Sequence, residues 1–492
     1  MKNKSTSRSA FFNLRLLFGT ASLSVAAFLA LFAGPTQRAP SGDHASRADT
    51  HICDSNRAPA GYIGGVRQAW VASYVGVFDD EATGIAVDGS LNVYVTGYSG
   101  APDSYHYVTI KYNAFGQEEW TAGYNIQDGI SFAAAIAIDR SGNVYFTGTS
   151  GTFSFGDNDY ATIKYNNSGQ QQWVARYSGL NNSDDRGTAI AVDHSGNVYV
   201  TGGSGFPSGD YATIKYNSSG QQQWVASYDG PGNGDDHAVA IAIDSSGNVY
   251  VTGYSPGSGT GTDYATVKYD NSGQQQWVAR YNGPGNGVDW ATGMVIDGSG
   301  NVYVTGESPG SDGFPDYATI KYDNSGQQQW VARYNGPGNL GDSATGIGID
   351  SSGNVYVTGT SVGSDGVSNY VTIKYDSVGQ QQWVARYTGP DNLGDHATAI
   401  AVSSSGNVHV TGQSSGDYGT IKYNSSGQEQ WVARYNGPQG FDDYARAIAL
   451  DRLGNVYVTG ATHQSDIQYD WDFATIKYIP DRTPLPQPRP SP

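Results

Sequence analysis

The hexapeptide Asn-Val-Tyr-Val-Thr-Gly at residues 248–253 recurs through most of this 492-residue chain. The string, or a near variant, begins at Asn92, Asn143, Asn197, Asn248, Asn301, Asn354, Asn407 and Asn455. A tryptophan in a Gln-rich, Val-Ala-Arg-Tyr context also occurs eight times, at Trp70, Trp120, Trp173, Trp224, Trp277, Trp330, Trp383 and Trp431. Successive tryptophans are 50, 53, 51, 53, 53, 53 and 48 residues apart. A regular period of this size indicates a repeat architecture.

One repeat, Ala238–Tyr281, shows how the unit folds. Four runs rich in β-branched and aromatic residues are separated by Gly-, Ser- and Asn-containing turns, and no run has a helical period. The first run alternates Ala with Val or Ile, so we expect both of its faces to be buried at the crowded centre of a radial array. Four strands in about 50 residues are typical of a β-propeller blade.

The two ends of the repeat region complete each other. The region opens with a lone fourth strand, Val66–Tyr74, and closes with a lone third strand, Phe473–Tyr478. Neither makes a blade alone, and an unpaired edge is a liability for a sheet protein. We therefore predict an all-β fold: a single eight-bladed propeller of four-stranded antiparallel blades over residues 66–480, closed by pairing of the N-terminal strand into the last blade.

The segments outside the repeats have their own character. Residues 1–33 combine a basic start with an apolar run, which predicts a signal peptide; an uncleaved membrane anchor is the alternative. Residues 34–65 are predicted to be a polar linker, and residues 481–492 a Pro-rich tail.

Composition excludes several functions. The formal net charge is −18, which argues against nucleic acid as a partner because phosphate binding needs a basic surface. A single cysteine, Cys53, excludes a disulfide framework and any Cys-rich metal centre. No histidine pair has metal-ligand spacing, and we expect no cofactor, with Ca²⁺ as the one alternative considered.

The Asp-x-Ser-Gly-Asn-Val-Tyr-Val-Thr-Gly string and the Tyr-Ala-Thr-Ile-Lys-Tyr that follows it resemble the bacterial secreted β-propeller repeat (SBBP) family. A weaker likeness is to eight-bladed quinoprotein dehydrogenases, whose blades carry a similar turn before a tryptophan. That likeness implies that all eight tryptophans dock on neighbouring blades. The quinone site of those enzymes uses an adjacent-cysteine disulfide, which Cys53 alone cannot supply.

An acidic residue precedes the first strand in seven of the eight units, and Ser131 takes its place in the other. These residues are Asp80, Asp185, Asp236, Asp289, Asp342, Asp395 and Asp443. We expect them near the mouth of the central channel. A ring of carboxylates there would concentrate cations, with oxygen ligands suited to Ca²⁺. The alternative, which we favour, is that each Asp caps its own Gly-rich turn by accepting backbone N–H bonds.

A ligand-binding site specific to this protein would use residues that depart from the repeated pattern. Positions where the repeat is interrupted are therefore the better candidates for site residues. Loop aromatics at Trp290, Tyr444 and Trp471 are candidates for stacking on sugar rings. The five arginines of the Val-Ala-Arg-Tyr strings lie mid-strand, and we interpret them as cross-strand charge partners.

These patterns favour a secreted, periplasmic or cell-surface bacterial protein that acts as a non-catalytic binding or scaffold module. We expect its partner to be an extracellular protein or polysaccharide, and the chain to be a monomer that meets a membrane only if the N-terminal segment is retained. One alternative is a glycan-active hydrolase or lyase using carboxylates such as Asp235 and Asp236. The other is a structural surface-layer component.

Overall fold

A computed structural model describes residues 62–63, 65–76, 78–101, 104–126, 129–152, 158–179, 183–206, 209–463 and 470–480. The predicted signal peptide and Pro-rich tail, and most of the predicted linker, lie outside these residues. Every helix or strand in the described part is a β-strand. None of the described segments forms a helix with the length and apolarity that a bilayer crossing needs.

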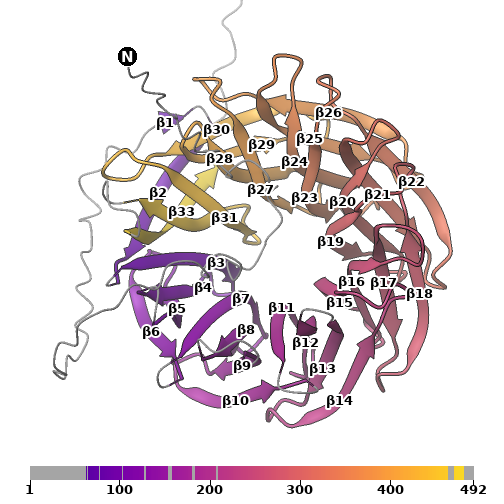
Figure 1. Cartoon of the computed structure of the whole chain (residues 1–492). Helices are drawn as coiled ribbons and strands as arrows, with labels where there is room; N and C mark the ends of the chain where they lie inside the picture. Colours follow the sequence, from indigo (N-terminus) through magenta and orange to yellow (C-terminus); the bar gives the residue numbers. More distant parts are fainter. Residues whose placement is uncertain are drawn as a thin grey trace, which may run out of the picture.

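The strands form eight antiparallel sheets arranged as blades around a central axis, as Figure 1 shows. The innermost strands of blades 1 to 8 are β3 (Asp79–Val87), β7 (Ile130–Ile138), β11 (Asp184–Val192), β15 (His237–Ile243), β19 (Trp290–Ile296), β23 (Asp342–Ile349), β27 (Asp395–Val402) and β31 (Asp443–Leu450). The second strands are β4 (Val93–Gly100), β8 (Val144–Gly151), β12 (Val198–Phe206), β16 (Val249–Pro256), β20 (Val302–Pro309), β24 (Val355–Val362), β28 (Val408–Ser414) and β32 (Val456–His463).

The outer half of each blade follows the same order. The third strands are β5 (His106–Tyr112), β9 (Asp159–Tyr165), β13 (Asp210–Tyr216), β17 (Thr262–Tyr269), β21 (Pro315–Tyr322), β25 (Ser368–Tyr375), β29 (Asp417–Tyr423) and β33 (Trp471–Pro480). The fourth strands are β6 (Glu118–Tyr124), β10 (Gln171–Tyr177), β14 (Gln222–Tyr228), β18 (Gln275–Tyr281), β22 (Gln328–Tyr334), β26 (Gln381–Tyr387), β30 (Glu429–Tyr435) and, in blade 8, β2 (Val66–Tyr74).

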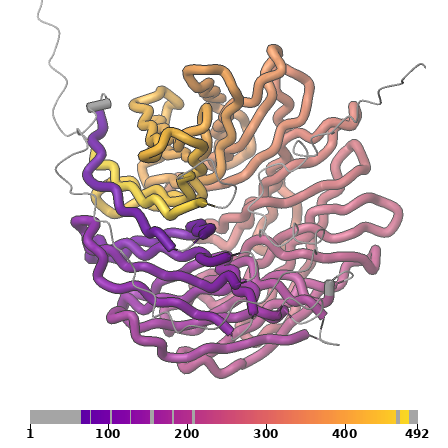
Figure 2. Tube along the Cα trace, turned by 60° about the vertical axis from the view of Figure 1, so that its left-hand side comes forward, coloured from indigo at the N-terminus to yellow at the C-terminus, as the bar shows by residue number. Residues whose placement is uncertain are grey.

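The ring closes as predicted. Strand β2 pairs antiparallel with β33, so that Tyr74 lies opposite Phe473, and the first and last strands of the propeller lie side by side in Figure 2. Tyr62–Ile63, within the predicted linker, form a two-residue strand, β1, that pairs with β2. Blade 8 therefore has five strands, and β1 rather than β2 forms its outer edge.

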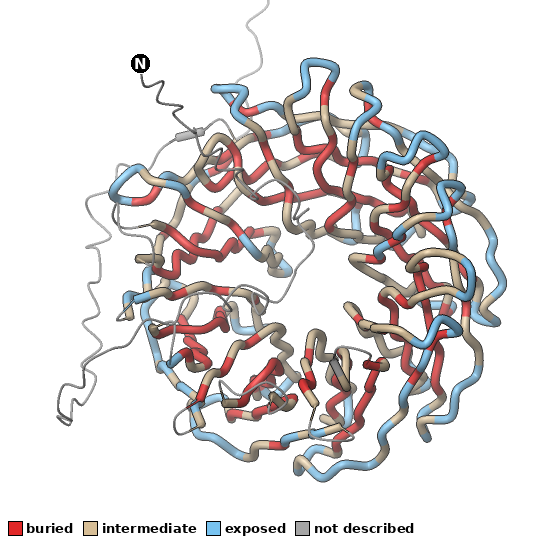
Figure 3. The backbone as a smooth tube through the Cα atoms, viewed as in Figure 1, coloured by how far each residue is buried: buried red, intermediate tan, exposed pale blue. Residues whose placement is uncertain are grey.

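Burial is greatest in the middle of each blade (Figure 3). Strand β4 is buried at every position, because its two faces pack against the adjacent blades. The innermost strand β3 alternates half-buried with buried residues from Asp79 to Gly84 and is half-buried from Ile85 to Val87. The expectation that both faces of the first strand are buried is therefore wrong, because one face of this strand borders the central channel.

Inner strands of neighbouring blades are joined by a repeated bulge. The register of the β3–β4 pair shifts between Ala82 and Gly84, and the intervening Thr83 donates its hydroxyl to Ala133 O of the next blade at 2.9 Å. The corresponding threonines of blades 3, 5, 6 and 7 make the same contact. A bulge changes the direction in which a side chain points. Here it directs the threonine hydroxyl toward the next blade, so that the hydroxyl joins the two inner strands.

Candidate functional site

The loop between the second and third strands is unusually short in blade 7. Strand β28 ends at Ser414 and β29 begins at Asp417, whereas the loop in blade 6 runs from Val362 to Ser368. Ser415 and Gly416 both have positive φ, 47° and 83°, as a two-residue hairpin turn requires. The propeller surface formed by this loop is therefore lower over blade 7 than over blade 6.

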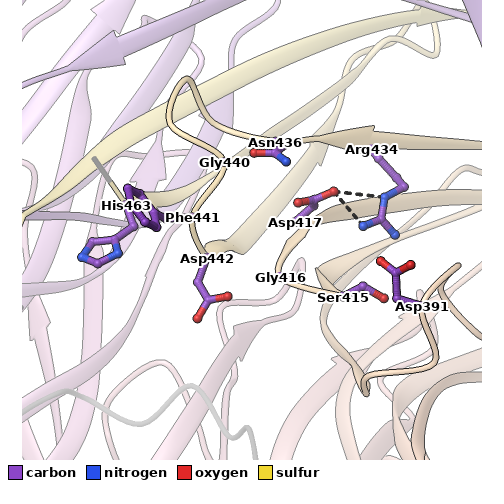
Figure 4. Close-up of a pocket in the computed structure, with 10 residues that line it drawn as sticks. All are labelled: Asp391, Ser415, Gly416, Asp417, Arg434, Asn436, Gly440, Phe441, Asp442 and His463. Carbon is purple, nitrogen blue, oxygen red and sulfur yellow. Dashed lines mark hydrogen bonds and ion pairs between the residues drawn. The ribbon is translucent and has the colours of Figure 1, made fainter. Parts of the chain in front are cut away.

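A pocket of about 450 Å³ opens where this loop is short. Such a volume is in the range of small-molecule sites, about 300–1,000 Å³. We call it the blade-7 pocket; Figure 4 shows its lining residues. They are Asp391, Ser415, Gly416, Asp417, Arg434, Asn436, Gly440, Phe441, Asp442 and His463.

One side of the blade-7 pocket is a fixed ion pair. Arg434 Nη2 donates to Asp417 Oδ2 at 2.7 Å, and the same guanidinium donates to the hydroxyl and carbonyl oxygens of Ser414. Arg434 comes from β30 and Asp417 from β29, so this is the cross-strand partner role expected for the repeated arginines. Asp391 and Asp442, on loops at either side, carry the remaining carboxylates, and both are exposed.

The opposite side is aromatic. Phe441 and His463 lie across the pocket from the ion pair (Figure 4), with ring centroids 5.6 Å apart. Behind them His463 stacks on Trp471 at 4.4 Å with an interplanar angle of 20°. Trp471 in turn contacts Tyr444, centroid to centroid, at 5.2 Å. Phe441 is thus the outermost member of an aromatic cluster that reaches from the pocket into blade 8.

The three aromatic residues predicted to stack on sugar rings therefore lie in two different parts of the structure. Tyr444 and Trp471 belong to the cluster behind the blade-7 pocket but do not line it. Trp290 lies in blade 5, 36% exposed, with its nearest ring contact at Tyr254, 6.0 Å away.

The seven repeated acidic residues lie at or just before the starts of the first strands, and none of them faces solvent. All seven side chains are fully buried, and each accepts a hydrogen bond from a glycine N–H of the preceding loop. Burial raises the pKa of Asp80 to about 7 and those of Asp236 and Asp443 to about 6. The favoured interpretation, that each Asp caps its own Gly-rich turn, is therefore confirmed, and the alternative of a solvent-facing carboxylate ring is wrong.

One of the two carboxylates suggested for the enzyme alternative is inaccessible for the same reason, whereas Asp235 is half-buried. Asp236 is completely buried at the junction between blades 3 and 4, and its Oδ2 accepts the Gly230 N–H at 3.0 Å. A carboxyl in this position cannot contact a glycosidic bond.

The eight tryptophans lie between blades. In seven of them the indole N–H donates to a backbone carbonyl in the turn between the third and fourth strands of the next blade. The acceptors of Trp70, Trp120, Trp173, Trp224, Trp277, Trp330 and Trp383 are Ala114, Asn167, Ser218, Asn271, Asn324, Ser377 and Ser425. Trp431 has no acceptor among the described residues, because in blade 8 the chain ends replace that turn; it packs instead against Val66.

Sequence reasoning did not select four lining residues, Asp391, Asp417, Arg434 and Phe441, as site residues. A signal was present, since the spacing of 48 residues between Trp383 and Trp431 is the shortest in the chain. It marks the blade that lost part of its loop.

Comparison with known proteins matches this architecture. A model of the β-propeller repeat family SBBP matches residues 76–103, 172–205, 230–259, 276–315, 329–366 and 430–468. No curated protein sequence matches the chain.

Solved structures of similar fold have very different sequences. One is the quinohemoprotein alcohol dehydrogenase ADHIIG from Pseudomonas putida HK5, with a TM-score of 0.53 and 14% identity over 87% of this chain and 78% of that one. Another is Sqt1 from Chaetomium thermophilum, with a TM-score of 0.53 and 10% identity over 85% of this chain and 100% of that one. At such identities the likeness extends to the fold alone.

Proposed function

We propose, on the premise that this chain belongs to the SBBP β-propeller repeat family, that it is a secreted or cell-surface module that binds a polysaccharide at the blade-7 pocket without acting on it. The observation that carries the proposal is the shortened loop of blade 7. The blades of this protein are nearly identical in sequence. A change found in one blade is therefore better explained by ligand binding than by a requirement of the fold.

The lining suits a sugar. Hydroxyl groups of a saccharide donate to carboxylates, and Asp391 and Asp442 offer exposed acceptors on two different loops. Arg434, held by Asp417 and Ser414, gives the pocket a wall that does not need to be ordered on binding. The aromatic rings of Phe441 and His463 provide an apolar surface for the C–H face of a sugar ring.

The same lining argues for binding over hydrolysis. A glycosidase needs a carboxylic acid that stays protonated near neutral pH, which usually requires burial. Asp417 is bonded to Arg434, while Asp391 and Asp442 are open to water. The N-terminal apolar segment supports export, which would bring the pocket to extracellular glycans.

The test is a glycan array probed with the labelled chain, followed by calorimetric titration of each hit. We expect Phe441→Ala to weaken binding about tenfold, or 1.4 kcal/mol, by removing the stacking surface. Trp290→Ala, an aromatic truncation in blade 5, is the matched control and should leave affinity unchanged. Binding to a protein but to no glycan, or equal loss in both variants, would overturn the proposal.

A further inference from the structure

An arginine–aspartate pair recurs at the outer junctions between blades. In blades 2, 4, 5 and 7 an arginine of the fourth strand pairs with an aspartate that begins or lies near the start of the third strand. These pairs are Arg176–Asp159 at 2.7 Å, Arg280–Asp263 at 2.9 Å, Arg333–Asp316 at 2.8 Å and Arg434–Asp417 at 2.7 Å. In blades 2, 4 and 5 the same guanidinium also donates to a tyrosine hydroxyl of the preceding blade, that of Tyr124, Tyr228 or Tyr281.

Blade 3 keeps the aspartate and lacks the arginine. Ser227 lies opposite Ala212 in β14, in the register that Arg280 has opposite Ala265 in blade 4. The side chain of Asp210 therefore has no hydrogen bond or ion pair with any described residue. The site where four blades hold a cationic group has none here.

Two further carboxylates face Asp210. Asp229 follows β14, and Asp236 immediately precedes β15 of blade 4. Carboxylate oxygens of the three residues all lie within 4.8 Å of one another. The residues at the position of Asp229 in the other seven blades are all uncharged: Val75, Asn125, Ser178, Asn282, Asn335, Thr388 and Asn436. Blade 3 thus loses a positive charge and gains a negative one at the same place.

The buried member of the group has a free oxygen. Asp236 is completely buried, its Oδ2 accepts the Gly230 N–H, and its Oδ1 has no hydrogen-bond partner. The nearest guanidinium of blade 4, Arg280, is bonded to Asp263, Ser255 and Tyr228, and it forms no ion pair with Asp236.

An unpartnered Oδ1 occurs in four other blades, at Asp80, Asp185, Asp289 and Asp395. At the junction between blades 3 and 4, two more carboxylates converge on the buried aspartate, and Arg280 is bonded there to Ser255 and Tyr228 instead of to any of the three carboxylates. After burial, the charges of Asp229 and Asp210 are what raise the pKa of Asp236, so the three groups repel one another.

We propose that Asp210, Asp229 and Asp236 bind one Ca²⁺, which takes the place of the guanidinium that pairs with the corresponding aspartate in blades 2, 4, 5 and 7. Three carboxylates form a hard oxygen ligand set, and Ca–O distances of about 2.3–2.6 Å allow ligand oxygens to be up to about 5 Å apart. Mg²⁺, with bonds of about 2.0–2.1 Å, requires a tighter arrangement. The ion would join the outer strands of blade 3 to the first strand of blade 4. Water completes its shell on the exposed side, at Asp229.

The experiment is a calorimetric titration of the EDTA-treated full chain with CaCl₂, repeated with MgCl₂. We expect one Ca²⁺ per chain, bound at least about tenfold more tightly than Mg²⁺. Asp229→Asn, at an exposed position that tolerates neutral residues in every other blade, should weaken Ca²⁺ binding about tenfold or more.

Ser227→Arg supplies the decisive comparison. This variant restores the residue that blades 2, 4, 5 and 7 carry, and it should fold, pair with Asp210 and lose Ca²⁺ binding. Asp263→Asn, in the equivalent pair of blade 4, is the control and should bind Ca²⁺ as the native chain does. No heat of Ca²⁺ binding in the native chain, or unchanged binding in both Ser227→Arg and Asp229→Asn, would overturn the proposal. The site is in a different part of the ring from the blade-7 pocket, so the two proposals fail independently.

Discussion

Trp70, from the N-terminal strand of the propeller, donates its indole N–H to Ala114 O of blade 1 at 3.2 Å. Lys477, from the C-terminal strand, donates its ammonium group to the same carbonyl oxygen at 3.1 Å. Both chain ends of the propeller therefore bind blade 1 through one acceptor. The last junction of the ring is held like the others, although its outer strands come from opposite ends of the sequence.

Trp70→Ala should destabilise this junction strongly. Trp70 is buried among Val93, Tyr112 and Tyr457, and truncation of a buried large aromatic typically costs about 3–5 kcal/mol. We expect a loss of about 3 kcal/mol in the free energy of unfolding, measured by urea denaturation followed by circular dichroism. Phe115→Ala, at an 80% exposed position in the adjacent turn, should change it by less than about 0.5 kcal/mol.

The same junction should make stability depend on pH. Burial, together with the charges of Asp80 and Asp470, raises the pKa of Asp472 to about 8, and burial raises that of Asp80 to about 7. The folded chain keeps these protons at pH values where an unfolded chain, with carboxyl pKa values near 3.8, has released them. The unfolding free energy should therefore fall as pH rises from 6.5 to 8.5, by up to about 1.4 kcal/mol per pH unit for each proton.

The variant Asp472→Asn tests whether the buried carboxyl of Asp472 causes this pH dependence. The neutral amide should flatten the pH dependence and raise the midpoint of unfolding at pH 8, because no charge has to be buried. The exposed Asp312→Asn serves as control and should retain the native slope. A native chain whose stability rises over this range would contradict the assignment.

The sequence predicted the ring well because its evidence is repeated eight times. The pairing of Val66–Tyr74 with Phe473–Tyr478 followed from counting strands, and the role of Arg280 as a cross-strand partner of Asp263 followed from its mid-strand position. The capping role of Asp236 followed from the Gly-rich turn before it, but its complete burial could not be predicted, because that depends on how the loop folds over the carboxylate.

The blade-7 pocket was missed for a related reason. It results from five residues that are absent between Ser414 and Asp417 relative to blade 6, and a motif search finds residues that are present. Phe441 and His463 line it only because neighbouring loops bring them together.

Blade 7 also lacks a hydrogen bond that the other blades share. In seven blades a tyrosine hydroxyl of the second strand donates to the aspartate that starts the preceding turn: Tyr94–Asp88, Tyr145–Asp139, Tyr199–Asp193, Tyr250–Asp244, Tyr303–Asp297, Tyr356–Asp350 and Tyr457–Asp451. In blade 7 these positions are His409 and Ser403, and both ring nitrogens of the buried His409 lack partners.

The double substitution Ser403→Asp with His409→Tyr should therefore stabilise the chain. Hydrogen bonds to charged groups contribute about 1.5–3 kcal/mol, and reorganisation of the site offsets part of this. We therefore expect the free energy of unfolding at pH 7 to rise by about 1 kcal/mol, measured by thermal or urea unfolding. His409→Tyr alone should gain less, because its hydroxyl would lack the carboxylate. Equal stability of the single and double variants would show that the aspartate contributes nothing.

The last prediction concerns why the blade-7 pocket is open. Replacing Ser415–Gly416 with residues 362–368 of blade 6 gives blade 7 the loop length of its neighbour and should cover Asp417 and Arg434. We expect saccharide affinity to fall at least about tenfold, measured by calorimetry, while the unfolding midpoint stays near the native value because loop lengthening costs little. The control replaces residues 309–315 of blade 5 with residues 256–262 of blade 4, a swap of equal length far from the pocket. If the blade-7 graft binds saccharide as tightly as this control, the ligand does not enter the pocket, and the shortened loop has another purpose.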